Sequence, residues 1–222
     1  AILMVLFSHI LWIYPAKRNF ITSAFEVFGL WGVEVFFVLS GFLIGGILYK
    51  IYTQSDFGKQ EVFLFLKRRW FRTLPNYYLV LIINMILAYC IGYEAKSSWK
   101  YFFFFQNFSN PMLPFFPESW SLSVEEFAYL LLPIALLFSM FIKVKNKSKR
   151  FISVIVALIL FFVTMKIVYH FANTNSTMTH WNMALKSVVI YRVDAILIGV
   201  AMAWYSKNYS NIWVKYKQSC FV

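Results

Sequence analysis

Long apolar runs recur along this chain and are separated by short stretches rich in lysine and arginine. Runs of this length are typical of membrane-spanning helices, and the short alternating pattern of barrel strands does not occur in the sequence. Hydrophobic residues make up 61% of the 222 residues and the mean hydropathy is +0.65. A soluble core of this size could not bury so much apolar side chain. We therefore predict an all-α fold, a polytopic bundle of transmembrane helices.

Six helices are expected, over residues 1–14, 33–51, 71–92, 123–142, 151–169 and 183–205. The first would span only ~21 Å, which is short of the ~30 Å hydrocarbon core of a bilayer. The chain is therefore interpreted as one membrane domain, residues 1–222, that is cut at both ends. The aromatic residues of the loop 93–118 predict a belt at the membrane surface, with sugar stacking as the alternative.

The basic residues alternate from one set of loops to the other. Segments 50–72, 143–150 and 207–217 are rich in Lys and Arg, whereas the alternate loops hold only Lys17, Arg18, Lys96 and Lys100. Because basic loops face the cytoplasm, we predict a multi-pass protein of the plasma membrane with both chain ends cytoplasmic. The net charge of +12 does not indicate nucleic-acid binding, since these residues lie between apolar runs and would meet membrane lipids.

Four cations lie within two helical turns at the start of the third predicted helix, in Lys67-Arg68-Arg69-Trp70-Phe71-Arg72. Arg69 and Arg72 are three residues apart and share a helix face, and a guanidinium group can bind phosphate through two hydrogen bonds. One interpretation is that Arg69 and Arg72, with Arg68 as a weaker candidate, bind a polyphosphorylated ligand. The alternative is a flank of the membrane helix whose side chains reach toward anionic lipid.

His9 stands alone in the otherwise apolar first helix. An ionisable residue within a membrane helix is a candidate for a functional site, and histidine can act as a general base near neutral pH. A hydrogen bond from His9 to a neighbouring helix would explain the residue equally well. The sequence leaves these two interpretations open.

Two adjacent carboxylates, Glu125 and Glu126, begin the apolar run of the fourth helix. The spacing Ser123-x-x-Glu126 fits a capping box, in which Ser123 caps the helix and Glu126 reaches back to the backbone. Glu125 has no such structural reason and lies roughly 100° around the helix from Glu126. We therefore predict a functional role for Glu125 and a structural role for Ser123 and Glu126.

The remaining polar and small residues of the predicted helices are interpreted as structural. Gly41 and Gly45 predict close packing of helices. Arg192 and Asp194 are two residues apart and do not face each other on a helix, so each is expected to have a partner elsewhere. Glu34, near the outer end of the second helix, joins this supporting group. No metal site is predicted, because the three His and two Cys are scattered.

Four stretches resemble the motifs of the membrane acyltransferase-3 family and occur in the family's order. They are Gly32–Ile44 (GVEVFFVLSGFLI), Phe65–Pro75 (FLKRRWFRTLP), Trp120–Phe127 (WSLSVEEF) and Arg192-Val193-Asp194 with Gly199. The family has about ten helices, and the chain resembles the first six. Glu34 stands where the family commonly has Asp, and the Gln that follows the family's second Glu is lacking after Glu126.

The resemblance implies an O-acyltransferase that binds no cofactor and uses acyl-CoA, most often acetyl-CoA, as co-substrate. The acyl group would pass from cytoplasmic acyl-CoA to a sugar hydroxyl of a cell-surface or lipid-linked glycan. In this interpretation the arginines hold the CoA phosphates, His9 is the general base or carries the acyl group briefly, and Glu125 orients His9 or the acceptor.

Two other classes of protein fit part of the pattern. A multi-pass transporter of a small polar or anionic solute is the first alternative, since permeases also carry intramembrane charges and glycine-rich helices. A transporter would be expected to show two halves related by a repeat, and the sequence shows none. A non-catalytic scaffold or partner subunit is the second alternative, and in that case His9 would be replaceable.

Overall fold

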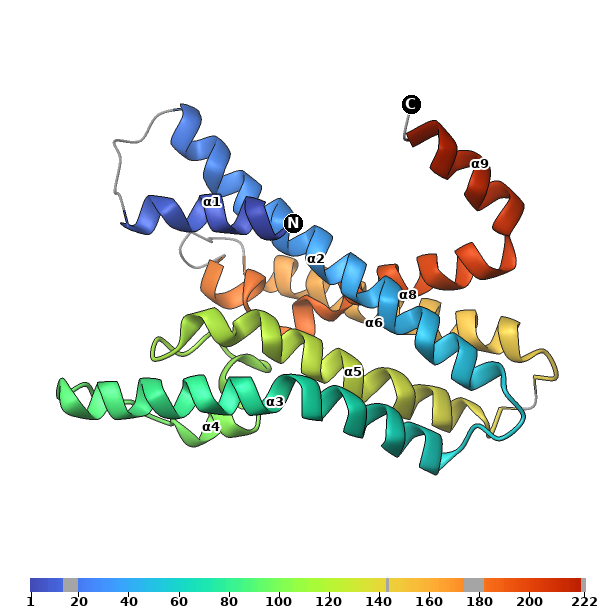
Figure 1. Cartoon of the computed structure of the whole chain (residues 1–222), viewed down its shortest axis with the longest axis horizontal. Coiled ribbons are helices and arrows are strands. Elements are labelled where there is room, and N and C mark those ends of the chain that lie inside the picture. Colours follow the sequence, from blue (N-terminus) through green and yellow to red (C-terminus); the bar gives the residue numbers. More distant parts are fainter. Residues whose placement is uncertain (14–19, 143, 174–181, 221–222) are drawn as a thin grey trace. The chain divides into compact units, whose positions relative to one another are not determined.

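The computed structural model describes residues 1–13, 20–142, 144–173 and 182–220, and these residues form helices and turns without a strand. They divide into two compact units (Figure 1), unit 1 being Ala1–Gly46 with Ala195–Val222 and unit 2 being Ile47–Asp194. The α-helices are α1 Ile2–Ile13, α2 Phe20–Thr53, α3 Lys59–Cys90, α4 Trp99–Phe102, α5 Trp120–Ser139, α6 Lys147–Ala172, α8 Val193–Asn208 and α9 Ser210–Cys220. Shorter helical turns are η1 Phe105–Asn107, η2 Pro117–Ser119, η3 Asn182–Lys186 and η4 Val189–Tyr191.

Four helices of the described residues are long and apolar enough to cross a membrane. They cover Val27–Thr53, Lys59–Cys90, Pro117–Ser139 and Lys147–Ala172. Large apolar side chains such as Leu43, Phe71 and Phe161 are exposed along their sides, as expected of helices that meet lipid. The predicted all-α membrane fold is therefore confirmed, although α1 and α8, with 12 and 16 residues, are shorter than a full span.

Two predicted helix starts were wrong. The second helix begins at Phe20 rather than at residue 33, and the third begins at Lys59 rather than at residue 71. Charges marked the segment before residue 71 as a loop, yet Lys, Arg, Glu and Gln are all good helix formers. The arginine cluster therefore lies inside α3, more than two turns from its first residue.

The predicted helix 183–205 is interrupted before α8. Val188 is extended, with φ −94° and ψ 129°, and separates the π-helical turn η3 from the 3-10 turn η4. The loop after α4 bonds the freed backbone: Asn107 Nδ2 donates to Ser187 O at 2.6 Å, and Ile190 N donates to Phe108 O at 3.3 Å. A side chain from a distant segment thus stabilises the break in the helix, and the local sequence does not predict it.

Glycines let α2 and α8 approach closely within unit 1. A Cβ added to Gly41 would overlap the backbone carbonyl of Ile196, and one added to Gly199 would overlap the carbonyl of Val38. A Cβ on Gly45 would lie 2.7 Å from Val200 Cα. The close packing predicted from Gly41 and Gly45 is confirmed, and Gly199 belongs to the same contact.

Gly41→Ala is expected to destabilise unit 1, because the obstacle to a new methyl group is backbone rather than a movable side chain. Forcing a methyl group into a packed interface costs about 1–3 kcal/mol. Gly46→Ala is the matched control, since nothing lies within 4 Å of the position of its Cβ. Thermal unfolding of both variants of the full-length parent in detergent checks this, and equal unfolding temperatures would contradict the close contact.

In unit 2 the aromatic loop folds back against α3 (Figure 1), which runs beside α5. Tyr77 and Tyr78 of α3 donate hydrogen bonds to the carbonyl oxygens of Tyr101 and Phe102, at 2.8 and 2.9 Å. Tyr101 is fully buried, and its hydroxyl donates to Leu113 O at 3.0 Å. Burial raises the pKa of Tyr101 above its ordinary value, so the phenol stays neutral and able to donate.

This arrangement corrects the prediction of a surface belt for the whole loop. Tyr101 and Phe104 are core residues, whereas Phe103 and Phe105 are exposed. The core position follows from the hydrogen bonds to α3, because each tyrosine of α3 binds a backbone carbonyl that water would otherwise bind.

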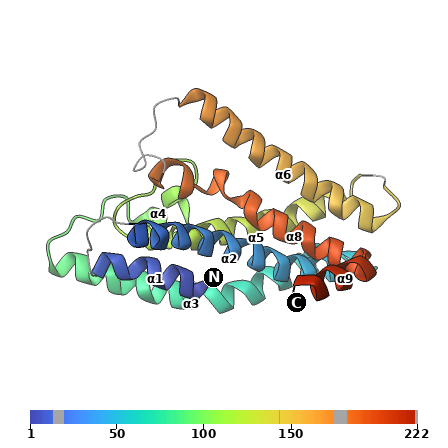
Figure 2. The same ribbon diagram turned by 90° about the horizontal axis from the view of Figure 1, so that it is seen from above.

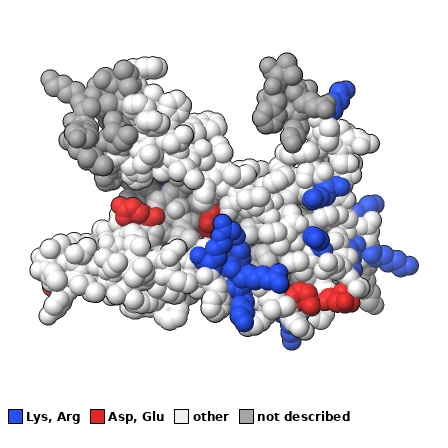
Figure 3. Space-filling view, viewed as in Figure 1, with Lys and Arg blue, Asp and Glu red and all other residues white. Residues whose placement is uncertain are grey.

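The basic residues of unit 2 gather toward the end where α2 stops, α3 starts and the α5–α6 loop lies (Figure 3). There Arg150 Nε donates to Tyr52 Oη at 2.6 Å, and that hydroxyl lies 2.8 Å from Ser139 Oγ. From this junction α6 diverges from α5 at an angle (Figure 2). These side chains thus tie the ends of α2 and α5 to the start of α6.

Candidate active site

The site is built where α3 and α5 face each other in unit 2. Thr73 of α3 donates a hydrogen bond to Glu126 Oε1 of α5 at 2.8 Å, and the same hydroxyl lies 3.2 Å from Arg69 O. Glu126 is only 5% exposed. Its second oxygen, Oε2, is buried and makes no hydrogen bond of good geometry among the described residues, although the Trp70 side chain is close enough to interact with the carboxylate. A buried carboxylate that is only half satisfied is costly for structure alone.

The predicted capping box was wrong. Helix α5 begins at Trp120, directly after the turn η2, and Ser119 occupies the N-cap position without a side-chain cap. Ser123 is instead buried inside the helix, where its hydroxyl accepts from Gln106 Nε2 at 2.6 Å. The structural reason that the sequence offered for Glu126 is therefore removed.

The three arginines of α3 have different surroundings. Arg69 is half-buried, with its guanidinium carbon 4.3 Å from the centre of the Tyr129 ring, and its buried Nε has no hydrogen-bond partner among the described residues. It interacts electrostatically with Glu126. Arg68 and Arg72 are exposed. Arg69 is thus the member of the cluster that reaches the α3–α5 interface.

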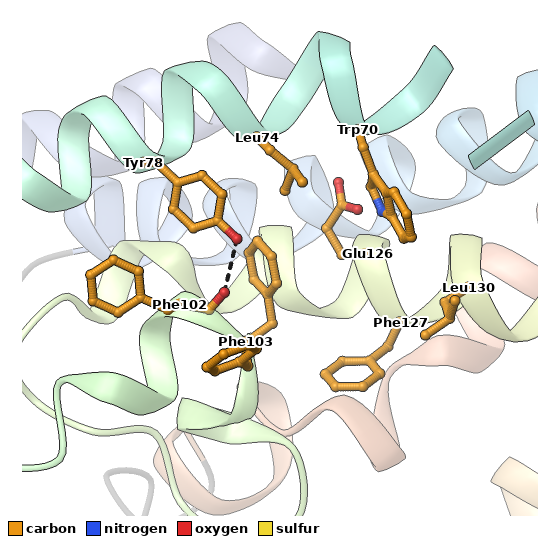
Figure 4. A pocket seen from close by; sticks show the side chains of 9 residues that line it. Trp70, Leu74, Tyr78, Phe102, Phe103, Glu126, Phe127 and Leu130 are labelled. Atoms are coloured by element: carbon orange, nitrogen blue, oxygen red, sulfur yellow. Dashed lines mark hydrogen bonds between the residues drawn. The ribbon is translucent and has the colours of Figure 1, made fainter. Parts of the chain in front are cut away.

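A cavity of about 310 Å³ adjoins Glu126 (Figure 4). Residues Trp70, Leu74 and Tyr78 of α3 form one wall, at the four-residue spacing of a single helix face. The other walls come from the aromatic loop and α5, namely Phe102, Phe103, Phe104, Phe127 and Leu130. Figure 4 shows the Glu126 carboxylate near Leu74 and beside the indole of Trp70. The cavity is thus an apolar pocket with one acidic group.

Phe104, in the wall of this pocket, has a strained backbone conformation. Its φ of 61° is in the left-handed region, which costs a bulky residue roughly 1–3 kcal/mol. Stacking on Tyr77, with ring centres 4.7 Å apart, and burial offset that cost. The pocket wall is therefore fixed by the protein itself.

The other predicted site residues are distributed over both units. His9 is exposed on α1, and Glu34 is half-buried on α2, both in unit 1. Glu125 is buried on α5 in unit 2. The pairing of His9 with Glu125 stays a prediction.

Asp194 has the distant partner that the sequence predicted for it. Lys166 Nζ of α6 lies 2.6 Å from Asp194 Oδ2, and the Asp194 side chain is 12% exposed. Arg192 is buried in the same unit. No group of three or more His, Cys, Asp or Glu side chains suited to a metal ion occurs among the residues that the structure describes.

The sequence did not single out Trp70, Thr73, Leu74 or Tyr78 as site residues. The signal was present in the sequence as a four-residue spacing. It places residues 70, 74 and 78 on one face of a helix and residues 69 and 73 on the neighbouring face. It was hidden because the charged residues before residue 71 place the predicted start of the helix there, so residues 69 and 70 fall outside it.

Comparison with protein families gives a match to the acyltransferase domain of the acyltransferase-3 family over residues 1–222, the whole chain. The chain belongs to the acyltransferase-3 family. The resemblance of its four motifs is thereby confirmed. Trp70 and Glu126 of the pocket, and Thr73, which binds Glu126, lie within two of the motifs that carry it, 65–75 and 120–127.

Relatives of this acyltransferase-3 chain include named O-acetyltransferases. The O-acetyltransferase OatA of Staphylococcus aureus (strain NCTC 8325 / PS 47) is 24% identical over 196 residues, which cover 79% of this chain and 30% of the relative. The putative peptidoglycan O-acetyltransferase YrhL of Bacillus subtilis (strain 168) is 29% identical over 206 residues, 82% of this chain and 30% of the relative. The chain thus spans about 30% of the length of these relatives. No solved structure shows significant similarity to it.

Proposed function

We propose that this chain is part of a membrane O-acyltransferase that moves an acyl group, acetyl in the first instance, from acyl-CoA to a sugar hydroxyl of a cell-surface or lipid-linked glycan. The observation that carries the proposal is the family match over residues 1–222. The relatives include proteins named as peptidoglycan O-acetyltransferases, which supports acetyl as the acyl group and a glycan as the acceptor.

The proposed sidedness follows the basic loops. Segments rich in Lys and Arg, including the α5–α6 loop and the start of α3, would face the cytoplasm of a bacterial cell, with both ends of this chain on the same side. Acyl-CoA would then approach the arginine cluster from the cytoplasm, and the acceptor would approach from the opposite face.

In the proposed reaction Arg69 and Arg72, with Arg68 as a weaker contributor, bind the CoA phosphates. His9 takes the proton from the acceptor hydroxyl while the hydroxyl oxygen attacks the thioester carbonyl. The carbon–sulfur bond then breaks and CoA leaves as its thiolate, which recovers a proton. Glu125 orients His9 or the acceptor sugar and stabilises the imidazolium that forms.

The proposal is tested by expressing the full-length parent in a host whose cell-wall glycan lacks O-acetyl groups. Base-labile acetate on the purified glycan is then measured. We expect ester-linked acetate that is absent from the empty host. A parallel culture of the same host that expresses YrhL is the positive control. If that culture acetylates its glycan, unmodified glycan in cells whose membranes contain the protein would contradict the proposal.

Replacing Arg69 or Arg72 by Ala is expected to weaken acyl-CoA binding by roughly tenfold or more, since each change removes a charged contact to phosphate worth about 1.5–3 kcal/mol. Lys should rescue only in part, because it is a point charge without the planar fork. Lys96→Ala, an exposed cation of the loop before α4, is the matched control. Unchanged affinity in both arginine variants would return the cluster to a lipid-facing flank.

A further inference from the structure

The pocket beside Glu126 has nearly no polar wall. Eight of its nine lining residues are apolar or aromatic, and the ninth is Glu126. The hydroxyl of Tyr78 already donates to Phe102 O at 2.9 Å. A sugar ring buried here would leave most of its hydroxyl groups unpaired, which is unfavourable. The pocket is therefore suited to a slim ligand that is mostly apolar and carries few hydrogen-bond donors.

The position of Glu126 predicts where a hydrogen-bond donor of such a ligand would lie. Thr73 occupies Oε1, whereas Oε2 is buried and makes no hydrogen bond of good geometry among the described residues, with only the Trp70 side chain as a weak neighbouring donor. A ligand N–H or O–H next to Oε2 would supply the missing hydrogen bond. Phe104 and the bond between Tyr78 and Phe102 fix the facing wall, so the ligand would enter a preformed site.

The arginine cluster and the pocket are continuous along α3. Arg69 and Arg72 lie within one turn of Trp70, the first pocket residue, and Arg69 interacts with Glu126. From Arg69 to Tyr78 the helix rises by roughly 14 Å. A ligand with an anionic head at the arginines would therefore have a neutral, extended tail beside Leu74 and Tyr78.

We propose that this pocket binds the pantetheine arm of the donor thioester, with Glu126 Oε2 accepting a hydrogen bond from an amide N–H or the hydroxyl of the arm. The inference rests on the proposed function and extends it from the phosphates of CoA to its neutral part. Glu126 thereby binds the acyl donor, and Trp70, Leu74 and Phe127 enclose the pantetheine arm.

Two variants of the full-length parent in detergent test the proposal by calorimetric binding. Glu126→Gln removes the charge but keeps the size, and Leu74→Trp fills the cavity. Each should weaken binding of CoA by about tenfold or more, as expected for loss of a charge-assisted hydrogen bond or of the space for the arm. Binding of adenosine 3′,5′-bisphosphate, which lacks the arm and the phosphate that carries it, should stay unchanged in both.

Glu118→Gln and Leu79→Trp are matched controls, because both side chains are exposed in the same unit. Unchanged CoA affinity in both test variants would overturn the proposal, and so would an equal loss for CoA and the bisphosphate. A selective loss of binding to a β-1,4-linked N-acetylglucosamine tetrasaccharide would assign the pocket to the acceptor instead. Absence of CoA binding in the unmodified protein would overturn the donor of the proposed function as well.

Discussion

His9→Ala in the full-length parent is expected to insert into the membrane and fold but to lower acyl transfer by about 10²–10⁴-fold, the usual contribution of a general base. A sugar hydroxyl is a weak nucleophile near neutral pH and needs a base within hydrogen-bond reach. His9 is the histidine of α1, and its side chain is exposed rather than used in packing. Its removal should therefore leave stability nearly unchanged.

The measurement is O-acetyl content of the glycan in cells that contain each variant at matched membrane levels. His170→Ala is the control, since His170 is an exposed residue near the end of α6 with no assigned role. Normal acetylation with His9→Ala would leave room for an acyltransferase but not for the mechanism proposed here.

Glu125→Gln is expected to be severe too, with a loss on the order of 10²–10⁴-fold in kcat at saturating acyl-CoA. The substitution keeps the size of a buried side chain and removes the charge that would stabilise an imidazolium. Glu118→Gln, which removes an exposed carboxylate seven residues earlier, is the control.

The Glu126→Gln variant distinguishes the role of this carboxylate from that of its neighbour. A purely structural role would make this variant mild, whereas a role in binding the acyl donor would raise the KM for acyl-CoA and leave kcat largely intact. If Glu126→Gln lowers kcat severely while Glu125→Gln is fully active, the roles of the two carboxylates are reversed.

Much of the fold could be predicted because its signals are local. The apolar runs specify the membrane helices, and Gly41 with Gly45 specifies the close contact of α2 with α8. Asp194 needed a partner and has one in Lys166. A charged side chain in an apolar environment predicts that a partner of opposite charge exists, even when the position of that partner in the sequence is unknown.

The pocket could not be predicted, because its parts meet only through tertiary contacts. A serine and a glutamate three residues apart can form a capping box or can both lie inside a helix. Because the turn η2 ends at Ser119 and α5 begins at Trp120, Ser123 and Glu126 lie inside the helix. The partner of Glu126 is Thr73, 53 residues away. The break before α8 likewise depends on Asn107, which is 80 residues from Ser187.

The most direct test of the proposed acyl transfer uses the full-length parent in proteoliposomes, with acetyl-CoA carrying a labelled acetyl group on the face of the basic loops and a β-1,4-linked N-acetylglucosamine tetrasaccharide on the other face. Mass spectrometry of the sugar should show labelled acetyl ester with the unmodified protein and almost none with His9→Ala. Sugar that stays unlabelled, although the same vesicles bind acetyl-CoA, would contradict transfer to a glycan hydroxyl.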